Sequence, residues 1–82
     1  MNTTIRFRIK KELDPIAEKK IIRFKGSLIA KSFTDIIYFD EENQEYYVHY
    51  FIIETSRRKE VTDYITLCIE RDSLLDTVTL LY

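Results

Sequence analysis

The sequence is poor in the residues that break or cross-link a chain. It has one glycine, one proline and one cysteine, and no tryptophan. A lone cysteine cannot form an internal disulfide, and the scarcity of glycine and proline argues against a flexible linker or a disordered chain. These absences predict one ordered domain over residues 1–82 that needs no oxidising compartment, which favours a cytoplasmic location.

Long apolar runs are also absent. No segment approaches the roughly 18 consecutive apolar residues that suggest a membrane-spanning helix, and no basic start precedes an apolar N-terminal stretch. We therefore expect neither a membrane span nor a signal peptide.

Patterns that carry catalysis or bind metals are missing as well. The sequence has no glycine-rich phosphate loop, no serine-nucleophile motif and no zinc pattern. His49 has no nucleophile or orienting acid near it along the chain, so we expect a hydrogen-bonded packing role. The acidic residues from Asp40 to Glu45 lack the spacing of a calcium loop. We expect no enzymatic activity, no cofactor and no metal site.

Charge, by contrast, is abundant and unevenly distributed. Residues 1–31 hold nine Lys or Arg against three acids, and residues 32–54 hold six acids and no Lys or Arg, although the net charge is only -1. Opposite blocks of this kind can pair across neighbouring strands or present a basic surface to a polyanion. Solvated surfaces that help to set strand register are the favoured interpretation.

The N-terminal segment alternates between apolar and polar side chains. Ile5, Phe7 and Ile9 fall on one side of the chain, and Arg6 and Arg8 fall on the other. A period of two predicts a half-buried strand.

The segment after this strand is compatible with two structures. Asp14 and Pro15 are typical of a helix start, with Asp as the N-cap and Pro at the first helical position. Gly26 is typical of a bulge or bend in a strand, and within a helix it would cost about 1 kcal/mol relative to alanine. We expect a short helical turn after Asp14 and extended chain from about Lys20, with a helix over residues 15–33 as the alternative.

Residues 35–53 are predicted to form a β-hairpin. Asp35–Phe39 would run out, the polar residues 40–45 would reverse the chain, and Tyr46–Ile53 would return. Both faces of the return strand are apolar, which indicates either a central strand covered on both sides or a strand with one face reserved for a partner.

A loop and a further strand are expected after the hairpin. Thr55–Asp63 is polar, which favours an exposed loop. Tyr64–Arg71 alternates, which predicts a strand with Cys68 as an outward-facing structural thiol and with three inward residues, Ile65, Leu67 and Ile69.

Residues 73–82 place apolar side chains at helical spacing, which favours an amphipathic helix, and their β-branched residues leave a final strand as the alternative. The predicted fold class is therefore α+β. We expect a small antiparallel β-sheet of about four to five strands, with one or two short helices packed on it.

Two stretches together resemble a known family. Residues 24–30 (FKGSLIA) are followed by a hairpin whose return strand carries Tyr46 or Tyr47, then Val48 and His49. Over residues 20–76 this pattern resembles the C-terminal β-rich part of the EXLDI family. The resemblance implies a β-rich fold and no particular activity.

Residues 3–19 resemble the start of ribbon-helix-helix antitoxins and repressors. In that family two copies pair their first strands and insert the ribbon into the major groove of DNA. The resemblance implies that four side chains of this strand would contact DNA, namely Thr4, Arg6, Arg8 and Lys10.

Tyrosine is the most informative of the abundant residues, because it is enriched in binding surfaces. Our candidates for a protein-binding surface are three tyrosines and two acids of the hairpin turn, namely Tyr46, Tyr50, Tyr64, Glu41 and Glu42. Aromatic rings beside arginine could also stack single-stranded nucleic acid. The tyrosines and the basic residues lie in different blocks of the sequence, however, and this separation weakens that idea.

The leading hypothesis is a small non-enzymatic interaction protein, such as a phage or mobile-element regulator or inhibitor, that binds another protein through an aromatic sheet surface. Self-association as a homodimer is compatible with it. The alternative is a dimeric DNA-binding regulator or antitoxin of the ribbon-helix-helix kind. Extended chain between Lys20 and Phe39 supports the first hypothesis, and helix there would favour the second.

Overall fold

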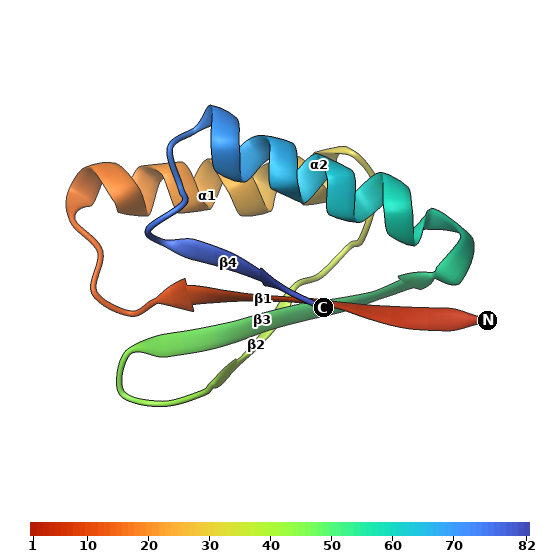
Figure 1. Cartoon of the computed structure of the whole chain (residues 1–82), viewed down its shortest axis with the longest axis horizontal. Coiled ribbons are helices and arrows are strands. Elements are labelled where there is room, and N and C mark those ends of the chain that lie inside the picture. The colour runs from red at the N-terminus through yellow and green to blue at the C-terminus, as the bar shows by residue number, and fades with distance from the viewer.

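The chain forms a four-stranded sheet with two helices on one of its faces (Figure 1). The computed structural model describes residues 1–82, and its elements are β1 (Asn2–Lys10), α1 (Pro15–Ala30), β2 (Tyr38–Glu41), β3 (Tyr46–Glu54), a single 3₁₀ turn (Thr55–Arg57), α2 (Arg58–Arg71) and β4 (Val78–Leu81). All neighbouring strands are antiparallel, in the order β2-β3-β1-β4. This is the split βαβ arrangement of ferredoxin-like domains, and it confirms the predicted α+β class.

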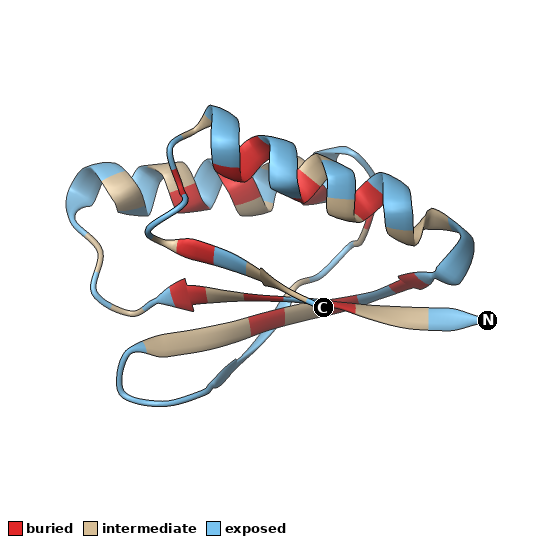
Figure 2. Cartoon of the chain, viewed as in Figure 1, coloured by how far each residue is buried: buried red, intermediate tan, exposed pale blue.

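The core lies between the sheet and the two helices. The predicted inward residues of β1, Ile5, Phe7 and Ile9, are all buried, which confirms this strand. Phe7 meets Phe24 of α1 edge to face, with 5.3 Å between ring centroids. Buried positions lie on the sides of the helices and strands that face one another (Figure 2), and they form one cluster of 15 residues. Neither helix has the length and apolar character needed to cross a bilayer.

The structure corrects the expectation for the segment after β1. The helix start was predicted correctly, since the Asp14 carboxylate accepts a hydrogen bond from the Ala17 N–H at 2.7 Å. The expected extended chain from Lys20 was wrong, because α1 continues to Ala30. Ile21, Phe24 and Leu28 are buried along one side of this helix. Burying each such side chain contributes about 1.5–3 kcal/mol, which outweighs the cost of one glycine in the helix.

Gly26 has no steric role in the folded chain, and this leads to a prediction. The residue is exposed in the middle of α1, and a Cβ added there would meet nothing within 4 Å. We expect Gly26→Ala to raise the free energy of unfolding by about 1 kcal/mol, because alanine has the higher helix propensity and restricts the unfolded chain. Urea denaturation followed by circular dichroism measures the change. A loss of stability would contradict the open surroundings of this position.

The predicted hairpin is confirmed, with its first strand beginning at Tyr38 rather than Asp35. Asn43 closes the turn, because its side-chain oxygen accepts hydrogen bonds from the N–H groups of Glu45 and Tyr46 at 2.8 and 2.9 Å. This asparagine supplies the turn without the usual Asn-Gly pair. β3 is an interior strand of the sheet, and the helices cover only one of its faces, so the expected cover on both sides was wrong. That the other face is reserved for a partner stays a prediction.

Residues 55–71 were predicted incorrectly as a loop and a strand. They form the 3₁₀ turn and α2, whose buried residues recur at helical spacing, at Val61, Ile65, Cys68 and Ile69. Leu67, expected to face inward, is 53% exposed, and Cys68, expected to face outward, is fully buried. Ile65 and Ile69 are four residues apart, a spacing that fits both a strand and a helix.

Residues 73–82 were also assigned to the wrong alternative. The helix expected there is absent, and β4 pairs with residues 6–9 of β1. Ser73 takes a positive φ of 57° just after α2 ends, and the next residue, Leu74, is buried. The chain therefore reverses direction, and its β-branched end completes the sheet.

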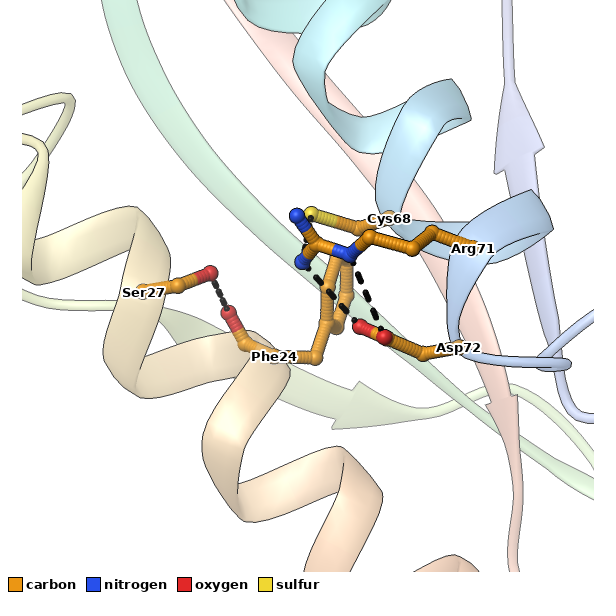
Figure 3. A network of polar contacts seen from close by, with 5 residues as sticks. All are labelled: Phe24, Ser27, Cys68, Arg71 and Asp72. Carbon is orange, nitrogen blue, oxygen red and sulfur yellow. Dashed lines mark hydrogen bonds and ion pairs between the residues drawn. The ribbon is translucent and has the colours of Figure 1, made fainter.

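Each helix makes polar contacts of its own where the end of α2 lies near α1 (Figure 3). Arg71 donates to both carboxylate oxygens of Asp72, at 3.2 and 3.3 Å, and one guanidinium nitrogen lies 3.7 Å from the sulfur of Cys68. On α1, the Ser27 hydroxyl donates to the carbonyl of Phe24 at 2.7 Å. These contacts satisfy polar groups where the two helices approach.

Candidate binding surface on the open face of the sheet

One face of the sheet carries both helices, and the other is left bare (Figure 1). We call the bare side the open face. Side chains alternate along a strand, so the register assigns to this face the residues opposite in direction to the buried ones. They are Thr4, Arg6, Arg8 and Lys10 of β1, Tyr38 and Asp40 of β2, Tyr46, Val48, Tyr50 and Ile52 of β3, and Thr79 and Leu81 of β4.

A row of three side chains crosses the open face at its centre. Tyr38 lies opposite Tyr50, and Tyr50 lies opposite Arg6 on the next strand. The two tyrosine rings stack at 5.6 Å between centroids and 24° between planes. Arg6 is exposed and takes part in no ion pair. This row therefore offers aromatic surface next to an uncompensated positive charge.

A second group lies nearer the hairpin turn. The Arg8 guanidinium sits 5.0 Å from the centroid of the Tyr46 ring and forms an ion pair with Glu42. Contacts of a cation with a ring face contribute about 0.5–1 kcal/mol at exposed sites, so they hold the long side chain along the sheet. Lys10 lies opposite Tyr46 and adds a further positive charge.

The open face carries both signs of charge in separate zones. Basic residues lie on β1, and Asp40 and Glu42 lie on or beside the edge strand β2. The negative charge of Asp40 raises the pKa of Tyr50, so the phenol keeps its proton throughout the physiological range and can donate a hydrogen bond. The surface is thus aromatic at its centre, basic along β1 and acidic along β2.

The structure brings together some of the protein-binding candidates and separates others. Tyr46 and Tyr50 share the open face. Tyr64 lies on α2, on the other side of the sheet, where its ring packs against Phe33 at 5.5 Å. Glu41 and Glu42 are both engaged, with Lys11 and Arg8 respectively. The hydrogen bond from Lys11 lowers the pKa of Glu41. These two pairs join the opposite charge blocks of the sequence, as expected for charges that help to set register.

The four candidates for nucleic-acid contact, Thr4, Arg6, Arg8 and Lys10, share the open face. β1, however, is an interior strand, paired with β3 on one side and with β4 on the other. A ribbon made with the β1 of a second copy needs a free strand edge, which residues 6–9 do not have. Helix over residues 20–30 was expected to favour this DNA-binding alternative, but the ribbon that the alternative needs has no free strand edge over residues 6–9. Any contact with nucleic acid would therefore use the side chains of the open face.

Six members of the open face were not among the candidates from sequence, namely Tyr38, Asp40, Val48, Ile52, Thr79 and Leu81. Tyr38 and Ile52 are 50% and 59% exposed. The hairpin pattern contained the signal for Tyr38, because a partner for Tyr50 on the opposite strand follows once the register is known. Leu81 was missed because the end of the chain was assigned to a helix.

His49 lies on the helix-facing side of β3 and is buried among aromatic rings. It stacks on Phe7 at 5.5 Å and on Phe39 at 5.4 Å. The predicted packing role fits this position, but the expected hydrogen bond is missing, since Nδ1 is enclosed without a partner. Burial, aided by the positive charge of Lys25, lowers the pKa of His49 to about 4. The imidazole is therefore neutral near pH 7.

The fold and the open face define a small α+β domain with one covered and one bare sheet surface. No family model matches the chain, and no curated protein or solved structure gives a match. The resemblances of residues 20–76 to the EXLDI family and of residues 3–19 to ribbon-helix-helix proteins stay predictions.

Proposed function

We propose that this chain is a small non-enzymatic interaction protein that binds another protein through the open face of its sheet. The observation that supports the proposal is the grouping of three tyrosines and two arginines on one uncovered surface, namely Tyr38, Tyr46, Tyr50, Arg6 and Arg8. Tyrosine and arginine are the residues most enriched at the energetic centres of protein interfaces. Regulation or inhibition of a partner, as in a phage or mobile-element protein, is compatible with such a surface.

The distribution of charge favours a protein over a polyanion. Glu42 forms an ion pair with Arg8. Asp40 lies on the same face, one strand away from Arg8, because both are paired with Val48 of β3. A phosphate backbone crossing the sheet would be attracted by β1 and repelled by the acidic edge at β2. A protein surface carrying both signs of charge can complement both zones.

Single-stranded nucleic acid is the second candidate, and one observation favours it. The sequence separates the basic residues from the tyrosines, but the pairing of β1 with β3 sets Arg6 beside Tyr50 and Arg8 over Tyr46. Rings and cations on an open four-stranded sheet form a platform on which bases can stack. The separation of tyrosines and basic residues along the sequence is therefore no longer an argument against binding of single-stranded nucleic acid.

The proposal is tested by capturing partners on the immobilised protein from a lysate of its native cell. We expect the double variant Tyr46→Ala, Tyr50→Ala to lose the captured protein by at least about tenfold, because truncation of residues at an interface centre costs about 2 kcal/mol or more. Tyr82→Ala is the matched control, since Tyr82 is 91% exposed at the chain end. A folded double variant that keeps every partner would refute this choice of surface.

Two further measurements separate the candidates. If the captured protein survives nuclease treatment of the lysate, a protein partner is supported. If capture is lost and the chain instead binds single-stranded RNA or DNA with an affinity that falls steeply with salt, the second candidate is correct. In that case Arg6→Ala should weaken binding and flatten the salt dependence. Sedimentation of the purified chain alone tests whether the partner is a second copy.

A further inference from the structure

A groove on the other side of the sheet is distinct from the open face. It lies between α1 and the edge strand β2 and has a volume of about 430 Å³. Phe39 points toward the helix layer, as its pairing with the buried His49 indicates, yet it remains 59% exposed. The cover that α1 gives to the sheet therefore ends before β2, and this leaves the groove open.

Aromatic side chains form the floor of the groove. Phe39 stacks on His49 at 5.4 Å and meets Tyr47 edge to face at 5.5 Å. Ile22 of α1 stands at the wall and is 64% exposed. Exposing this much apolar surface in one concave site is unfavourable in water, and it is typical of sites that bind a ligand.

A buried polar atom at the floor is left without a partner. His49 is only 4% exposed, and its Nδ1 makes no hydrogen bond. Buried polar atoms are nearly always paired in folded proteins, so an unpaired one calls for an explanation. The other unpaired buried side-chain atom, Arg8 Nε, belongs to the open face, so on the helix-facing side the unpaired atom lies at this groove.

The charges around the groove are mainly positive. Three lysines, Lys10, Lys11 and Lys25, line it together with one acid, Glu18. Lys11 is already paired with Glu41 and lies 5.0 Å from the centroid of the Tyr47 ring. Lys25 takes part in no ion pair. Its side chain lines the groove together with His49 and Phe39.

We propose that this groove binds a small amphipathic anion, an aromatic or aliphatic carboxylate whose apolar body covers Phe39 and Tyr47 and whose charged end pairs with Lys25. The volume is within the range of sites for small organic ligands, roughly 300–1,000 Å³. The apolar floor matches the body of such a ligand, and the uncompensated lysine matches its charge. The sheet separates this site from the open face, and Lys10 at the end of β1 is the one residue that belongs to both.

The test uses two fluorescent probes that share one ring system. Anilinonaphthalene sulfonate carries a negative charge, and phenylnaphthylamine is its neutral counterpart. We expect the anionic probe to bind with a stoichiometry of one and about tenfold more tightly than the neutral probe, because only the anionic probe can make a charge-assisted contact with Lys25. Fluorescence titration of the full chain at neutral pH measures both affinities.

Two substitutions assign the binding to the groove. Lys25→Gln should weaken the anionic probe about tenfold and leave the neutral probe unchanged, for the same reason. Ile22→Asp should weaken both, because it sets a negative charge at the apolar wall. Lys19→Gln is the matched control, since Lys19 is an exposed lysine of α1 outside the groove, and it should change neither affinity. All three positions are on the surface of α1 or half-buried there, so the variants should fold.

Three results would overturn the proposal. Equal affinities of the two probes would show that the negative charge of the ligand does not contribute to binding. If Lys19→Gln weakened the anionic probe as much as Lys25→Gln, the probe would be attracted by the overall positive charge of α1 and not by the groove. Loss of probe binding as the chain dimerises at high concentration would assign the groove to a second copy. Each outcome leaves the proposal for the open face untouched, because capture through Tyr46 and Tyr50 is measured separately.

Discussion

Phe7→Ala is expected to lower the free energy of unfolding by about 3–5 kcal/mol, the usual cost of truncating a buried phenylalanine. Phe7 is completely buried at the centre of β1, where it contacts Phe24 of α1 and His49 of β3. Truncation of its ring leaves a cavity between β1, β3 and α1. Domains of this size have a total stability of about 5–15 kcal/mol, so the change removes a large part of it.

Urea denaturation followed by circular dichroism measures the effect, and a second substitution keeps it measurable if the alanine variant does not fold. Phe7→Leu retains most of the apolar volume and should cost less than Phe7→Ala. Ile52→Ala is the control on the same sheet, because Ile52 is 59% exposed on the open face, and we expect it to cost less than about 1 kcal/mol. Similar losses for Phe7→Ala and Ile52→Ala would contradict the placement of the core.

Acidification below pH 6.5 is expected to destabilise the protein through His49. The pKa of this residue is about 4 in the folded chain, whereas an unfolded chain has a histidine pKa near 6.5. Between these values the unfolded state binds a proton that the folded state does not bind. The contribution of the neutral imidazole is therefore complete above pH 6.5 and is lost as the pH falls toward 4, by about 3 kcal/mol in total.

The comparison variant is His49→Phe, which keeps an aromatic ring between Phe7 and Phe39 and has no titrating group. Carboxylates titrate in the same range, but they contribute equally to both proteins. The difference in free energy of unfolding between wild type and variant, measured from pH 7 to pH 4, isolates the histidine. A difference that stays constant across this range would show that the imidazole protonates as freely in the folded chain as in the unfolded one.

These effects concern the core, and the open face is expected to behave differently. Tyr46 and Tyr50 are only partly buried, and neither is a member of the core cluster of 15 residues. Their truncation should therefore affect binding more than folding. The stability measured for Phe7→Ala and the capture measured for the tyrosine variants report on opposite faces of the same sheet.

Local sequence patterns were sufficient to predict β1, the start of α1 and the hairpin. The alternation of Ile5, Phe7 and Ile9 predicted β1, the Asp14-Pro15 pair predicted the start of α1, and the polar turn predicted the hairpin. In each case a short stretch of chain carries its own signal, such as a period of two, a capping side chain or an Asx turn.

Three elements were assigned incorrectly because their local signals conflict. Gly26 argued against a helix that three buried side chains stabilise. Ile65 and Ile69 fit both a strand and a helix, and only their contact with the core decided for α2. The end of the chain fits an amphipathic helix equally well, but the free edge of β1 was available to pair with it. Tertiary packing overrides propensity in such segments.

By itself the sequence determined the composition of the surface: an aromatic strand, a basic strand, an acidic turn and no recognisable catalytic group. The tertiary structure decided which of these lie together. Arg6 and Tyr50 are far apart along the chain and become neighbours only through the pairing of β1 with β3. The reason is physical, since the register of two distant strands depends on which faces are buried against the helices, and no local pattern specifies it.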